Sequence, residues 1–66
     1  MNITINGRER QVSDGATAAE AVRLLTTAGS GIACAVNGQV VTRSAWESTP
    51  LAEGDQVEVL TAVQGG

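Results

Sequence analysis

The sequence predicts an α+β fold, in which a mixed sheet of four to five strands carries one main helix across one face. Three observations predict it. Asn-Gly pairs at 6–7 and 37–38 each join two strand-like segments, a stretch with helical spacing lies between these hairpins, and an alternating apolar segment follows the second one. The chain has 66 residues, enough for one domain. We therefore expect residues 1–63 to form a single domain and residues 64–66 to form a flexible tail.

The first hairpin opens the chain. Residues 1–6 alternate apolar and polar side chains, which is typical of a half-buried strand. Asn6-Gly7 is a strong hairpin signal, because both turn positions need a positive φ. The return strand over residues 8–12 is highly polar, so we place it at an edge of the sheet, where charges discourage unwanted pairing.

A helix is predicted over residues 18–27. Thr17 and Glu20 have the spacing of a capping box, in which the threonine side chain bonds the backbone N–H of the glutamate and the carboxylate reaches back. Gly29 follows where a left-handed helix cap belongs. The residues expected on the buried face, at helical spacing, are Ala18, Ala21, Val22, Leu25 and Ala28.

The second half of the chain continues with short elements. We expect a strand over Ile32–Val36, a strand over residues 39–42, one helical turn over residues 44–48, a tight turn at residues 53–55 and a final strand over residues 56–63. Cys34 has the strand parity of a core residue, and free cysteine is among the most buried residue types. Trp46, the only aromatic residue, is expected to anchor the loop before the last strand.

The order of these elements, β-β-α-β-β-β, predicts the β-grasp, or ubiquitin-like, arrangement. In that arrangement the first and last strands run parallel at the centre of the sheet. The end of the chain then leaves from the middle of the sheet, supported on both sides, which suits the presentation of a tail.

Composition argues against a catalyst. The chain has no His and no Tyr and a single Cys, so it lacks most acid–base candidates. Its net charge of −3 and its four arginines leave no basic patch for nucleic acid. No apolar run reaches transmembrane length and no signal-peptide pattern precedes the first strand. We therefore expect neither a nucleic-acid nor a membrane partner, a cytoplasmic location and a monomer when the protein is free.

The chemistry is expected in the final residues. Glycine has no Cβ and lets the backbone approach another surface closely. Gly65 and Gly66 together make a thin tail that ends in a carboxylate and can thread into a narrow active site of another protein. This tail is the only candidate for chemistry, and it would be acted upon rather than act.

Apolar residues near the tail predict a surface for a partner. If the valines of the last strand pack under the helix, Leu60 and Ala62 are exposed beside the tail. One of Val40 and Val41 must also face outward in a regular strand. Together these side chains are expected to form a patch that a partner contacts. The neighbouring acidic residues are expected to be solvated surface, namely Glu47, Glu53, Asp55 and Glu58.

Several stretches together resemble one family. They are the opening strand with Asn6-Gly7, the segments at residues 35–38, 43–46 and 51–59, and the ending at residues 62–66. The Val-Gln-Gly-Gly ending after a Gly-Asp-x-Val-Glu-Val strand is the most specific of them. Over essentially its whole length the chain resembles the ThiS-type sulfur carriers of thiamin thiazole biosynthesis.

The resemblance implies chemistry at Gly66. In such carriers a partner enzyme uses ATP and Mg²⁺ to adenylate the C-terminal carboxylate. Sulfur from a persulfide donor then displaces the AMP, which produces a thiocarboxylate. The thiocarboxylate supplies sulfur to a thiazole synthase. By this resemblance Gly66 carries the sulfur, Gly65 supplies clearance, and Val63 and Gln64 set the reach of the tail. The chain itself is expected to bind no cofactor or metal.

Three other functions remain open at this point. The chain could carry sulfur for molybdopterin or for tRNA thiolation, since such carriers share the fold and the diglycine. It could be a protein modifier joined through Gly66 to lysines of other proteins, although its own lack of lysine prevents lysine-linked chains of itself. It could also be a non-covalent ubiquitin-like interaction module in which the diglycine plays no part.

Overall fold

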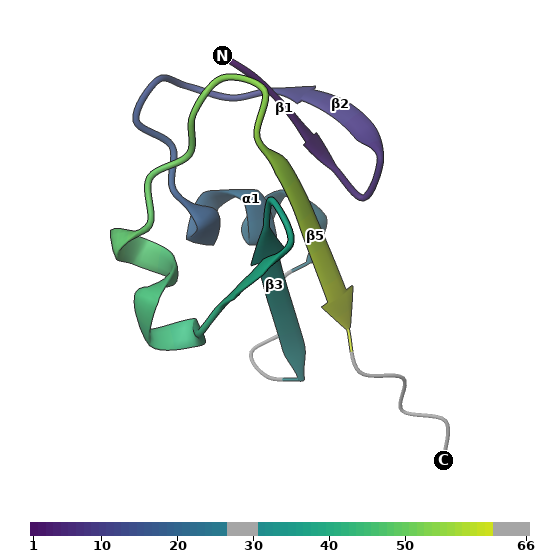
Figure 1. The fold of residues 1–66 in the computed structure, drawn as a ribbon, viewed down its shortest axis with the longest axis vertical. Coiled ribbons are helices and arrows are strands. Elements are labelled where there is room, and N and C mark those ends of the chain that lie inside the picture. Colours follow the sequence, from purple (N-terminus) through teal and green to yellow (C-terminus); the bar gives the residue numbers. More distant parts are fainter. Residues whose placement is uncertain (27–30, 62–66) are drawn as a thin grey trace.

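The computed structural model of this chain describes residues 1–26 and 31–61. Within them the elements follow the predicted order (Figure 1). These are β1 (Asn2–Ile5), β2 (Arg8–Gln11), α1 (Ala18–Leu25), β3 (Ile32–Val36), β4 (Gln39–Val41), a 3-10 helix η1 (Arg43–Ser48) and β5 (Gln56–Thr61). The described residues include no helix that is long and apolar enough to cross a membrane.

The strands form one mixed sheet with β5 at its centre. The strand order is β2-β1-β5-β3-β4, so the polar strand β2 lies at an edge as expected. β1 runs parallel to β5, whereas β3 runs antiparallel to β5. In Figure 1, β5 crosses the middle of the molecule and α1 lies behind it. The prediction of an α+β β-grasp fold with one main helix across one face is confirmed.

Both hairpins turn on Asn-Gly pairs with positive φ. Asn6 and Gly7 have φ values of 52° and 81°, and Asn37 and Gly38 have values of 52° and 83°. Positive φ at both central positions is the requirement of a type I′ turn, whose twist matches that of the paired strands. These two turns set the register of β1 against β2 and of β3 against β4.

The core lies between α1 and the facing side of the sheet. Its helix residues are mostly alanines, which allow the helix to approach the sheet closely. Cys34 and Trp46 are both buried here, as predicted. The cluster comprises Ile3, Ile5, Ala18, Ala19, Ala21, Val22, Cys34, Trp46, Leu51, Val57 and Val59.

The helix differs from its prediction in two ways. Leu25, expected in the core, is 42% exposed, and Ala19, which was not predicted, is buried. The helix packs against η1 as well as the sheet, and an ion pair of 2.6 Å joins Arg23 of α1 to Glu47 of η1. Burial is therefore concentrated in the first part of the helix, and Leu25 stands at its last residue, where Thr26 already has extended backbone.

The predicted capping box is wrong. The side chain of Thr17 makes no capping hydrogen bond, and the backbone N–H of Glu20 donates to the Thr17 carbonyl at 3.0 Å instead. Thr17 also forms an isolated bridge with Pro50, and the backbone N–H of Ala18 donates to the carbonyl of Thr49 at 2.9 Å. A neighbouring loop thus satisfies the start of the helix. The predicted continuation to Thr27, with Ala28 and Gly29, lies outside the described residues.

Candidate functional site

The candidate site lies where β5 ends. β5 is described to Thr61, which pairs with Ile32 of β3. The predicted site residues that follow it lie outside the described residues, namely Ala62, Val63, Gln64, Gly65 and Gly66. Their roles, and the separate tail at residues 64–66, stay predictions. The described part of the site is therefore the end of β5 and the surface around it.

The two neighbours of β5 hold it over different lengths. On one side β3 pairs with it from Val57 through to Thr61. On the other side the backbone of β1 pairs only at Thr4 with Gln56 and at Ile5 with Val57. The side chain of Asn6 then continues this contact, because its Oδ1 accepts from the backbone N–H of Val59 at 2.8 Å and its Nδ2 donates to the Val59 carbonyl at 3.0 Å.

The start of β5 is held by a second asparagine. Asn37 Oδ1 accepts from the backbone N–H of Gln56 at 3.0 Å, and its Nδ2 donates to Asp55 Oδ1 at 3.0 Å. Asp55 Oδ2 accepts in turn from the backbone N–H of Ala52 at 2.8 Å. The expectation that Asp55 is simply solvated surface is therefore wrong: it is partly buried and it closes the turn before β5.

The face of the sheet turned away from α1 carries an apolar patch. Leu60 is 68% exposed and Val40 is 77% exposed, whereas Val41 is partly buried against the core, so Val40 is the one of the pair that faces outward. The register places Ala33 opposite Leu60 and Ala35 opposite Val40. We call Ala33, Ala35, Val40 and Leu60 the outer-face patch. The exposure predicted for Leu60 is confirmed, and its predicted contact with a partner stays a prediction.

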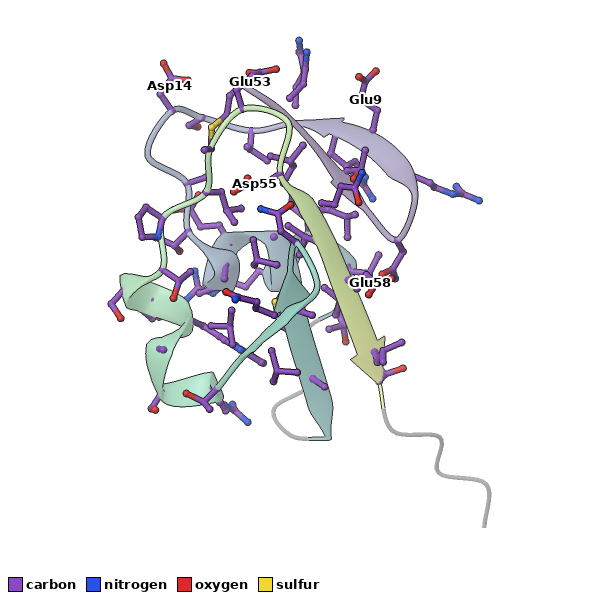
Figure 2. The ribbon with its side chains drawn as sticks, viewed as in Figure 1. Glu9, Asp14, Glu53, Asp55 and Glu58 are labelled. Atoms are coloured by element: carbon purple, nitrogen blue, oxygen red, sulfur yellow. The ribbon has the colours of Figure 1, made fainter. Side chains whose placement is uncertain are left out.

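A basic side chain lies beside the outer-face patch, because Arg43 lines a surface pocket together with Ala33, Leu60 and Thr61. Figure 2 shows Glu58 on β5 and Asp55 where β5 begins, and it shows Glu9, Asp14 and Glu53 at the other end of the molecule from Glu58. The register places Glu58 opposite Ala35 of the patch. Within the described residues, no cluster of three or more His, Cys, Asp or Glu side chains could hold a metal ion. Burial raises the pKa of the Cys34 thiol, which keeps it protonated and poorly nucleophilic.

Sequence reasoning missed the two asparagine side chains that bind β5. It assigned both residues to turns, and the structure confirms those turns. Their second role depends on contacts with residues 53 and 19 positions away, which no local pattern reveals. The sequence held no separate signal of this role, because asparagine is itself favoured at the first position of such a turn.

Comparisons with known proteins agree with this architecture. The model of the ThiS family matches residues 3–66. The sulfur carrier protein ThiS of Escherichia coli (strain K12) is 32% identical over 66 residues, which covers all of both chains. A crystal structure of the thiamine biosynthesis protein ThiS from Geobacter metallireducens has a TM-score of 0.78 at 32% identity and full coverage of both chains.

A solution structure of a thiamine biosynthesis protein from Geobacter metallireducens has a TM-score of 0.80 at 32% identity, and the match covers all of this chain and 88% of that one. The likeness therefore includes both the order of the elements and their packing. Because the family model matches nearly the whole sequence, the chain belongs to the ThiS family.

Proposed function

We propose that this chain is a sulfur carrier of thiamin biosynthesis and that the carboxylate of Gly66 is the group that carries sulfur. The observation that supports this most directly is the match to the ThiS family, which extends through Gly66. The Escherichia coli relative, described as a sulfur carrier, covers the same length. The protein is then a substrate of other enzymes rather than a catalyst.

The proposed chemistry needs a partner enzyme. A carboxylate is a poor electrophile, so ATP bound with Mg²⁺ by the partner converts the Gly66 carboxylate to an acyl-adenylate and releases pyrophosphate. The terminal sulfur of a persulfide then displaces AMP, and a thiol cleaves the resulting S–S bond to leave the thiocarboxylate. The oxyanion formed in the displacement requires preorganised donors, which the partner must supply.

The position of β5 supports this proposal. β5 lies at the centre of the sheet, where β1 and the Asn6 side chain hold it as far as Val59 and β3 holds it through Thr61, so a tail that continues from it has a rigid base. Rigid placement limits the ordering that a partner must impose when it binds the tail. The outer-face patch includes Leu60 of the same strand and offers an apolar surface for the adenylating enzyme.

Intact mass spectrometry tests the proposal. After incubation with the cognate adenylating enzyme, ATP, Mg²⁺ and a persulfide donor, we expect one oxygen of the chain to be replaced by sulfur. A persulfide on Cys34 would instead add a whole sulfur atom, so the two products differ in mass. A variant with Cys34→Ala should react as the unaltered protein does, because the sulfur is carried at Gly66. Deletion of Gly66 should abolish the exchange. An unchanged mass with a demonstrably active enzyme would refute the carrier function.

The destination of the sulfur is a separate question. We propose a thiazole synthase as the acceptor, since the relative from Geobacter metallireducens is described as a thiamine biosynthesis protein in both of its structures. Transfer of labelled sulfur from the thiocarboxylate to the thiazole product would support this. Transfer only to molybdopterin or tRNA would keep the carrier chemistry and change the pathway, whereas a ladder of conjugates on other proteins would indicate a modifier.

A further inference from the structure

The first Asn-Gly turn does more than reverse the chain. Asn6 contacts Val59 through both ends of its side-chain amide, although the two residues are 53 positions apart in the sequence. An asparagine side chain offers one carbonyl acceptor and an NH₂ donor, the same pair that a peptide unit offers. Asn6 therefore binds β5 as one more residue of β1 would.

The backbone of β1 cannot make this contact itself. Its last backbone bond to β5 is from the Asn6 N–H to the Val57 carbonyl, at 2.9 Å. At Asn6 and Gly7 the chain then adopts positive φ and turns away toward β2. The backbone N–H and C=O of Val59 point toward the β1 side of the sheet. Without the Asn6 side chain they would lose their hydrogen-bond partner there. Aspartate could accept from the N–H but could not donate to the carbonyl.

The contact lies near the end of β5. Val59 is followed in the described strand by two residues only, Leu60 of the outer-face patch and Thr61. As far as Val59, β5 is bonded on both sides; at Leu60 and Thr61 the register continues with β3 alone. The length of the two-sided support is thus set by one side chain.

We infer that Asn6 is a positioning residue. It sets the point at which β5 loses the two-sided support of the sheet, and so it orients the described end of the strand, Leu60 and Thr61. Its consequence for sulfur transfer rests on the proposed function, whereas its effect on β5 does not. Loss of the Asn6 side chain should loosen the end of β5 and leave the partner to order a longer segment on binding.

Asn37 provides a matched control. It occupies the same position in an equivalent turn, with the same φ of 52°, and its side chain also binds β5. However, it holds Gln56, at the beginning of the strand. Asn6→Gly and Asn37→Gly each keep a residue suited to the turn and each remove two side-chain hydrogen bonds, both to Val59 in the first case and one each to Gln56 and Asp55 in the second. A general loss of stability would therefore affect both variants alike, and only Asn6→Gly should affect the end of the strand.

Amide hydrogen exchange of the free protein measures the effect directly. Asn6→Gly should speed exchange at Val59 by about fivefold to thirtyfold, the range expected for the loss of one or two hydrogen bonds. The N–H of Leu60 points the other way, toward β3, because backbone groups alternate along a strand. Faster exchange at Leu60 would therefore report loosening of the strand end and not merely a missing partner. In Asn37→Gly, exchange should rise at Gln56 and not at Val59 or Leu60.

The enzymatic readout is pyrophosphate release by the cognate adenylating enzyme. Asn6→Gly should raise KM for the carrier several-fold with kcat unchanged, whereas Asn37→Gly should leave both unchanged. Unaltered exchange at Leu60 in Asn6→Gly would overturn the inference, as would an equal KM in the two variants. Should Asn6→Gly fail to fold, Asn6→Asp keeps the turn and the acceptor for the Val59 N–H but loses the donor to the Val59 carbonyl. The readouts for that variant are then exchange at Leu60 and KM, with the same outcomes expected for both. If the unaltered protein accepts no sulfur, the proposed function fails, and the exchange data still decide the role of Asn6.

Discussion

Truncation of Leu60 gives the most direct measure of the outer-face patch. Full burial of a leucine side chain is worth about 1.5–3 kcal/mol. Leu60 is 68% exposed in the free protein, so a partner that covers it would gain most of this amount, about 1–2 kcal/mol. Leu60→Ala should therefore weaken the complex with the adenylating enzyme by about fivefold to thirtyfold. Leu60→Glu should weaken it further, because it would bury an unpaired carboxylate.

Isothermal titration calorimetry against the cognate adenylating enzyme measures this affinity. The matched control is Leu24→Ala, which truncates a leucine that is 47% exposed on α1, on the other side of the sheet from the patch. Circular dichroism should show that both variants keep their fold, since substitutions at exposed sites change stability by about 0.5 kcal/mol or less. Equal affinities for the Leu60→Ala and Leu24→Ala proteins would refute the assignment of this face to the partner.

Two further predictions concern the core. Trp46 Nε1 donates to the Val41 carbonyl at 2.9 Å, and phenylalanine would remove this donor. Trp46→Phe should therefore lower the free energy of unfolding by about 1–3 kcal/mol, measured by urea titration with circular dichroism. A loss of under about 0.5 kcal/mol would argue against this anchor. The folded pKa of Cys34 lies above its unfolded value, so its contribution to stability is complete below the unfolded pKa of about 8.5 and is lost as the pH rises through the folded pKa. The melting temperature should thus fall more steeply above that pH in the unaltered protein than in Cys34→Ala, and identical profiles would contradict the buried, neutral thiol.

Local patterns were sufficient to predict most of the fold. Alternation along β1 and β5 and the Asn-Gly signals at both hairpins depend on neighbouring residues only, and the structure confirms them. The prediction that β5 lies at the centre of the sheet also held, because connection rules leave few arrangements for this order of elements.

The errors arise where distant segments meet. Ala19 is buried on a helix that packs against η1 as well as the sheet, and η1 begins 24 residues further along the chain than Ala19. The capping role predicted for Thr17 failed because a loop near Thr49 and Pro50 takes part in the start of the helix. In each case a contact distant in sequence replaced a local preference, and periodicity contains no information about such contacts.

The place of β5 in the sheet also bears on mechanical load. Its backbone bonds to β3 and β1 lie across the strand, perpendicular on the antiparallel side and slanted on the parallel side. A pull along the chain at Thr61 therefore strains these bonds together, in shear, rather than opening them one after another. An enzyme that draws the end of this chain into a narrow channel would pull the domain in its most resistant direction, and the folded domain would act as a stop against the channel mouth.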